Sequence, residues 1–198
     1  MKEVIPKNSR YVPIVQQRSC CVPACISMII YKRGIPLVPQ ELLGYHLGLT
    51  VDKESIPLFW NPRTGKRPPS GYGTQIYKPQ YHPNKVLPKL GIPLRMTYYP
   101  ISDFDKKKFI SFLASAVKED KDVLVCFDHG SLTDGKPSGG GHVCVLDRYM
   151  AKEGKVRLVD PSANQPKWRV VTVQQLMKAM QDHTSQKSAG FWEFNLIK

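Results

Sequence analysis

The sequence lacks an uninterrupted apolar run of the roughly 18 residues that a membrane-spanning helix needs. Its first eight residues also lack the apolar core of a signal peptide, because they include an acid and a proline. We therefore expect a protein that is made and retained in the cytoplasm. Only five cysteines occur in 198 residues, too few and too odd in number for a disulfide framework. This count agrees with a reducing compartment.

Acidic residues are scarce. The sequence has 16 Asp and Glu but 29 Lys and Arg, which gives a net charge of +13. A balance of this size suggests an acidic partner such as nucleic acid, an anionic membrane surface or an acidic protein, and it says nothing about the fold. Zinc-finger spacing, basic heptads and the aromatic strand signature of RNA-binding modules are all missing. The charge alone leaves nucleic acid open, but we expect a peptide or protein partner, acidic if the charge serves binding.

The stretch 55–102 contains no acid at all, yet it holds seven basic side chains and nine of the 17 prolines. Proline excludes long helices, so 61–80 is expected to be an irregular basic loop. We interpret about 55–92 as an insertion that is either simply solvated or faces an acidic or extended peptide. In the second interpretation the seven basic side chains, interleaved with Tyr72, Tyr77 and Tyr81, form a positive rim beside the site. They are Arg63, Lys66, Arg67, Lys78, Lys85, Lys89 and Arg95.

The helix and strand patterns that are present predict a single α+β domain over 1–198. The run 22–33 is apolar nearly all round, has Pro23 near its start and is followed by Gly34, so it predicts a buried helix. Helices come early and neighbouring strands late, which indicates a buried central N-terminal helix packed on a C-terminal antiparallel sheet. The other expected elements are helices at 39–47, 103–120 and 173–182 and strands at 94–99, 122–127, 142–150, 155–160, 168–173 and 190–197.

Cys21 falls at the N-terminus of the expected central helix. The helix dipole and unpaired backbone N–H groups there favour a thiolate, which is the form that a nucleophilic cysteine needs. Gln16, a few residues upstream, offers an amide donor for a developing oxyanion. The alternative is ordinary packing, because cysteine is among the most buried residue types.

His142 opens a strand directly after three glycines, and Asp160 closes the next strand. Because the two strands are expected to form a hairpin, the start of one lies beside the end of the other. A histidine next to a carboxylate is the pairing that a general base and its orienting partner require. The alternative is that His142 is a loop residue and that Asp160 only forms a turn.

The order Cys, His, Asp, with a glutamine before the cysteine, resembles the papain-like cysteine peptidases. The pattern is most similar to the double-glycine leader peptidases of bacteriocin exporters and their stand-alone relatives. The matching words in this sequence are Gln16, Cys21-Val22-Pro23-Ala24-Cys25, Gly141-His142-Val143 and Asp160-Pro161-Ser162. The resemblance reaches from about 11 to 197, with 49–92 poorly covered. It implies a peptidase in which Cys21 attacks, His142 is base and then acid, Asp160 orients His142, and Gln16 helps to form the oxyanion hole.

Three departures from that pattern leave alternatives open. Val22 stands where the family has glycine after the nucleophile. Cys20 competes with Cys21, although the Pro-Ala register favours Cys21. Gln17 competes with Gln16, although the separation of Gln16 from Cys21 fits the pattern better.

The predicted function is a cysteine peptidase that hydrolyses a peptide or isopeptide bond through a covalent acyl-enzyme, without a cofactor. One alternative is a binding module that kept the fold and lost the chemistry. A second is an acyltransferase with the same triad, because both reactions use the same nucleophile and base. A third is a zinc site built from Cys20, Cys21, Cys25 and a histidine, which the absence of paired C-x2-C spacing disfavours.

Overall fold

The computed structural model describes residues 8–59, 64–183 and 188–197. Its six strands form one antiparallel sheet in the order β1-β6-β2-β3-β4-β5. The expected α+β class is therefore confirmed. The strands are β1 (Leu94–Pro100), β2 (Asp122–Asp128), β3 (Gly141–Met150), β4 (Lys155–Val159), β5 (Trp168–Thr172) and β6 (Gly190–Leu196).

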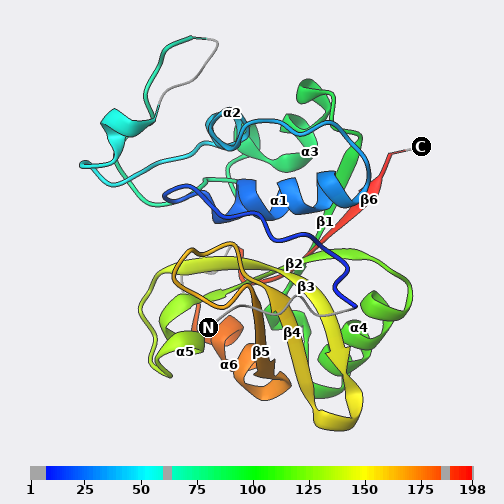
Figure 1. Ribbon diagram of the computed structural model, residues 1–198. Helices are drawn as coiled ribbons and strands as arrows, with labels where there is room; N and C mark the ends of the chain where they lie inside the picture. Colours follow the sequence, from blue (N-terminus) through cyan, green and yellow to red (C-terminus); the bar gives the residue numbers. More distant parts are fainter. Residues whose placement is uncertain (1–7, 60–63, 184–187, 198) are drawn as a thin grey trace.

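Helices cover both faces of this sheet, as Figure 1 shows. The helix that begins at Cys21 lies with two shorter helices on one face, and the other three lie on the opposite face. The helices are α1 (Cys21–Lys32), α2 (Gln40–His46), α3 (Pro83–Val86), α4 (Lys106–Lys118), α5 (His129–Thr133) and α6 (Val173–Asp182).

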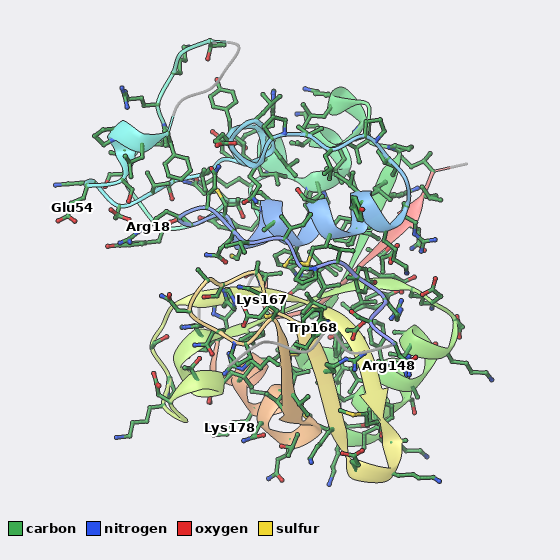
Figure 2. The ribbon with its side chains drawn as sticks, viewed as in Figure 1. Arg18, Glu54, Arg148, Lys167, Trp168 and Lys178 are labelled. Carbon is green, nitrogen blue, oxygen red and sulfur yellow. The ribbon has the colours of Figure 1, made fainter. Side chains whose placement is uncertain are left out.

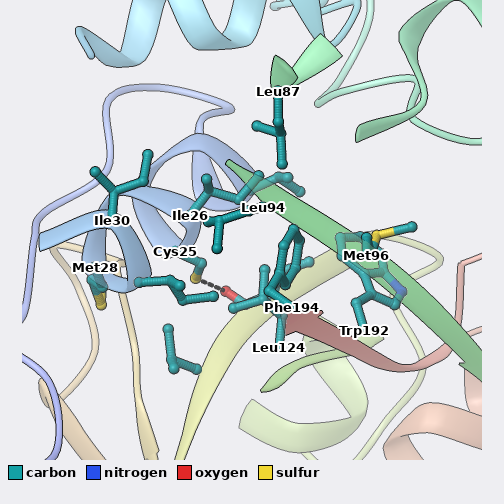
Figure 3. Packing of buried hydrophobic residues seen from close by; sticks show 14 of the residues in the cluster. Cys25, Ile26, Met28, Ile30, Leu87, Leu94, Met96, Leu124, Trp192 and Phe194 are labelled. Carbon is teal, nitrogen blue, oxygen red and sulfur yellow. Dashed lines mark hydrogen bonds between the residues drawn. The ribbon is translucent and has the colours of Figure 1, made fainter. Parts of the chain in front are cut away.

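The two faces of the sheet carry two separate hydrophobic cores, because successive side chains of a strand point to opposite faces. Leu124 of β2 packs toward α1, whereas Val123 and Val125 pack toward α4 and α6. Every residue of β2 is buried, as expected for a central strand covered on both sides. Figure 3 shows the α1 side, where the Cys25 thiol donates to the backbone oxygen of Val143.

The C-terminal end of α1 is tied to the sheet by charge. The carboxylate of Asp122 is fully buried at the start of β2, and it pairs with Lys32 at 2.8 Å and with Arg33. Tyr11 also donates its hydroxyl to Asp122, at 2.8 Å. Removing one partner of such a buried pair typically costs about 3–5 kcal/mol. Lys32, in the last turn of α1, and Arg33, its C-cap residue, therefore fix where α1 lies on the sheet.

Two helices lie outside the sequence-based prediction. Helix α5 falls between the strands expected at 122–127 and 142–150, where the carboxylate of Asp128 caps the backbone N–H of Ser131. Helix α3 falls within the insertion, where the ring of His82 accepts from the backbone N–H of Asn84. Helices of four and five residues are too short to show the apolar periodicity on which prediction depends. In the ranges described, no helix is long and apolar enough to cross a membrane.

Candidate active site

Cys21 is the first residue of α1, and its side chain lines a cleft of about 810 Å³. A turn delivers it there, since Ser19 has a left-handed φ of 60° and Cys20 is the N-cap residue. The Cys20 side chain points elsewhere. It is fully buried in a small cluster with Leu49, Val51 and Phe59, and burial raises the pKa of its thiol to about 12. Of the two neighbouring cysteines, only Cys21 faces the cleft.

His142 and Asp160 meet at one end of the sheet, as the hairpin geometry predicts. His142 is the second residue of β3 and Asp160 follows the last residue of β4. The Nε2 atom of His142 lies 2.8 Å from Oδ1 of Asp160, and both side chains are buried. His142 also lines the cleft and contacts Cys21. The fold thus brings Cys21, His142 and Asp160 into one row.

The electrostatics of this row favour a charged histidine. Burial alone would lower the pKa of His142, but its hydrogen bonds with Asp160 and Cys21 outweigh burial and raise the pKa to about 9. Burial opposes ionisation of Asp160, yet its bond with His142 and the backbone N–H of Ser162 lower its pKa. At neutral pH these shifts favour an imidazolium beside a carboxylate.

A second layer of contacts holds Asp160. Its Oδ1 accepts the Ser162 backbone N–H at 2.9 Å, which closes a turn over Pro161. Its Oδ2 lies 3.6 Å from Nη1 of Arg169, a buried residue of β5 that sequence reasoning missed. The Arg169 guanidinium also donates to the backbone oxygen of Leu132 in α5. A lone arginine in a strand belongs to no recognisable motif. Only the pairing of β4 with β5 brings Arg169 close to the Asp160 carboxylate.

Gln16 lies beside this row and Gln17 does not. The backbone N–H of Gln16 donates to the oxygen of Pro161 at 2.9 Å, so the segment before α1 is tied to the turn after Asp160. Its side chain lines the cleft, and its Oε1 has no hydrogen-bond partner among the residues described. Gln17 is exposed and donates its amide to Glu41. The same outer edge carries Arg18, which pairs with Asp52, and Glu54 (Figure 2).

The glycine-rich loop before His142 is anchored by Asp128 at the end of β2. The backbone N–H and the hydroxyl of Ser138 both donate to this carboxylate. Gly141 then permits a close approach, since a Cβ there would lie 2.8 Å from the ring of His183. Gly141 thus makes room for His183, which also lines the cleft.

His129 is a further cleft residue that the sequence did not reveal. Its ring lies 5.1 Å from that of His142 at an interplanar angle of 72°. Burial, and next the neighbouring charge of His142, lower the pKa of His129. A single histidine at the start of a short helix carries no motif, so only the folded arrangement identifies it.

The insertion contributes tyrosines rather than charges to the cleft. Tyr72 and Tyr77 line it, whereas no lysine or arginine of the described residues does so. Arg67 instead donates to backbone oxygens of Ile56 and Pro57 in its own loop. Arg63 lies outside the described residues. The expected positive rim is therefore absent from the described lining of the cleft.

One group of side chains has the spacing of metal ligands. Donor atoms of His142, Cys144 and Asp160 lie within 4.8 Å of one another. These atoms already bind each other, because both His142 and the Cys144 thiol are hydrogen-bonded to Asp160. The zinc alternative drew on Cys20 and Cys25, which point into the small cluster and toward the sheet instead.

Comparison with known proteins assigns the chain to a family. The family model described as Peptidase_C39 like matches residues 9–188. No curated protein matches the sequence. A solved structure from Bacillus anthracis, described provisionally as a C39-like peptidase, aligns with a TM-score of 0.54 and 18% identity over 93% of this chain and 94% of that chain. At this identity the structural likeness shows the fold alone. Because the family model covers most of its length, the chain belongs to the Peptidase_C39 like family.

Proposed function

We propose that the protein is a cysteine peptidase, formed by one domain, with Cys21 as nucleophile and His142 and Asp160 as its base and orienting carboxylate. The observation that carries the proposal is the position of His142 between the other two. Its Nε2 is held by Asp160 at 2.8 Å, which leaves the other ring nitrogen available to the Cys21 sulfur. A nucleophile, a base and an orienting group in this order are the requirement for acyl transfer to cysteine.

In the first half of the reaction the Cys21 thiolate attacks the carbonyl carbon of the scissile bond. The carbonyl π electrons move to oxygen and give a tetrahedral oxyanion. His142, as imidazolium, then gives its proton to the leaving nitrogen. Collapse of the oxyanion breaks the C–N bond, releases the amine and leaves a thioester on Cys21.

In the second half water replaces the amine. Neutral His142 takes a proton from the water as its oxygen attacks the thioester carbonyl. The C–S bond then breaks, the carboxylic acid product leaves, and Cys21 is again a thiolate beside imidazolium. An acyltransferase would use the same steps with an amine or thiol in place of water.

The oxyanion would be stabilised at the start of α1. The backbone N–H of Cys21, as the first helical residue, has no carbonyl within the helix to bond to. The Gln16 side chain lies in the same cleft, and its anchoring to Pro161 keeps it there. Together these are two donors at the positive end of a helix dipole.

The test uses a peptide library prepared by digesting a bacterial proteome with trypsin, with new termini detected by mass spectrometry. Wild-type protein should create new termini, and ¹⁸O from labelled water should enter each new carboxyl group. Cys21→Ala should lower the rate by about 10⁴-fold or more. Cys20→Ala is the matched control and should keep turnover. Equal turnover in wild type and Cys21→Ala would contradict the proposal, and loss of activity in Cys20→Ala alone would move the nucleophile.

A further inference from the structure

A second cavity, of about 210 Å³, adjoins the cleft and shares Ile76, Tyr77, Ser188 and Trp192 with it. The insertion therefore forms part of the boundary between the two spaces. The second cavity thus borders the proposed substrate site.

The floor of this cavity is an apolar part of the sheet. Tyr98 of β1 lies opposite Trp192 of β6 in the strand register, and Met96 lies two residues before Tyr98 on the same face. Figure 3 shows Met96 and Trp192 close together where these two strands meet. Met96 and Trp192 are almost fully buried within the larger core. The floor is therefore fixed by packing, whereas Tyr77, on the insertion side, is about half exposed.

The polar atoms of the floor are already in use. The Tyr98 hydroxyl donates to the backbone oxygen of Ala189 at 2.8 Å, and the Trp192 indole N–H donates to that of Ser188 at 2.9 Å. What remains for a ligand is mainly ring faces, the Met96 thioether and the side chain of Ile76. A polar group placed there would lose its water without gaining partners. An apolar group would gain both burial and ring contacts.

We propose that this cavity is a specificity pocket that receives one bulky apolar or aromatic side chain of the peptide bound in the cleft. The inference rests on the proposed function, because it takes the cleft to hold a peptide. It gives the insertion a role: Ile76 and Tyr77 close the pocket from the side opposite the sheet. Selectivity for the substrate thus depends on a segment that contributes nothing to the catalytic row.

A charged side chain is a poor occupant of the same pocket. Among the residues that line it, His82 is the one whose charge changes near neutral pH. Burial lowers the pKa of His82, and its Nδ1 already accepts the Asn84 backbone N–H, so the ring is neutral at pH 7. The described residues that line the pocket offer no cation for a carboxylate and no anion for a lysine or arginine of the substrate.

The first test profiles cleavage of the same proteome-derived peptide library. We expect one position near the scissile bond to favour Phe, Tyr, Trp, Leu or Met over Ala by at least about 10-fold in kcat/KM, the discrimination typical of hydrophobic pockets. Tyr77→Ala should reduce this ratio by at least about threefold without unfolding the protein, since the side chain is half exposed. Tyr72→Ala is the matched control, because Tyr72 lines the cleft but not the second cavity. Any loss in that variant should be equal for all side chains.

The second test does not depend on turnover and uses the Cys21→Ala protein. N-acetyl-phenylalaninamide should shift the NMR signal of the Trp192 indole N–H, and N-acetyl-glycinamide should not. Tyr77→Ala should weaken the effect. Library cleavage without preference at any position would overturn the pocket and leave the proposed function intact. If no peptide is cleaved, the proposed function fails, and the pocket stands or falls on the indole shift alone.

Discussion

The two sides of the cleft are built in different ways. One side comes from the start of α1, the start of β3 and the turn after β4, and short hydrogen bonds hold its side chains in place. The other side comes from the insertion, where Tyr72 is 86% exposed and Tyr77 is 53% exposed. In the proposed peptidase the reacting side chains therefore lie at the ends of helices and strands, whereas recognition is assigned to a segment with little regular structure. Substitutions on the first side should change rate, and those on the second should change selectivity or association.

The largest effect in this comparison is expected for Asp160→Asn. Asn keeps the turn, because its side-chain oxygen can still accept the Ser162 N–H, but it cannot stabilise His142 as imidazolium. We expect folding to persist and kcat to fall by about 10⁴-fold. Steady-state kinetics with circular dichroism as the folding control checks this. A nearly silent substitution would mean that Asp160 is only a turn former.

A smaller loss is expected for Gln16→Ala. Removing one donor of an oxyanion hole lowers kcat by about 10²–10³-fold. Gln17→Ala is the matched control, because the exposed Gln17 bonds Glu41 instead of facing the cleft. Comparing kcat and KM for the two variants checks the assignment. The same loss in both would show that the segment before α1, and not the Gln16 amide, is what matters.

The pH dependence tests the catalytic row without changing its geometry. The pKa of His142 is raised to about 9, so the imidazolium that the leaving group needs is lost above that pH. We expect kcat/KM to fall above about pH 9. The stability that this shift contributes is complete below the unfolded pKa of about 6.5 and is lost as pH rises through 9. In Asp160→Asn, the alkaline limb of the pH profile of kcat/KM should move to lower pH. An alkaline limb that stays at the same pH in this variant would contradict the account.

Substitution of Arg169 should move the alkaline limb of the pH profile in the opposite direction, to higher pH. Arg169→Met removes a positive charge 3.6 Å from Asp160, so the carboxylate stabilises the imidazolium more strongly and the limb moves to higher pH. Arg169→Lys keeps the charge and should keep the limb. Because the guanidinium also bonds Leu132, both variants need a thermal unfolding control. If Arg169→Met leaves the alkaline limb at the same pH, Arg169 has only a structural role and does not influence the charge of His142.

The smallest effect concerns the basic part of the insertion. Neutralising Arg63, Lys66 and Arg67 together should slow association of an acidic peptide severalfold and leave the chemical step unchanged. Charges outside the cleft act mainly on the association rate, and salt screens them over about 8 Å at physiological ionic strength. Stopped-flow association at two salt concentrations checks this. Unchanged association and unchanged salt dependence would mean that the +13 charge serves another purpose.

Much of the first side of the cleft could be predicted from the sequence, and little of the second. The hairpin rule places His142 beside Asp160, and helix start signals place Cys21 at an N-terminus, because both rest on local patterns. Arg169 and His129 could not be predicted, because only long-range pairing of strands and helices brings them to the site. The insertion misled prediction for a related reason. Its composition revealed charge, but which side chains turn inward depends on how the loop packs on the sheet.

The central claim is that Cys21, at the start of α1, is an activated nucleophile. The most direct measurement is labelling at neutral pH with a thiol-reactive peptidyl electrophile, followed by mass mapping of the five cysteines. The account predicts rapid labelling of Cys21 and none of Cys20, which is fully buried and has a thiol pKa of about 12. Labelling of Cys20 with Cys21 untouched, or no difference between Cys21 and a free thiol in solution, would contradict it.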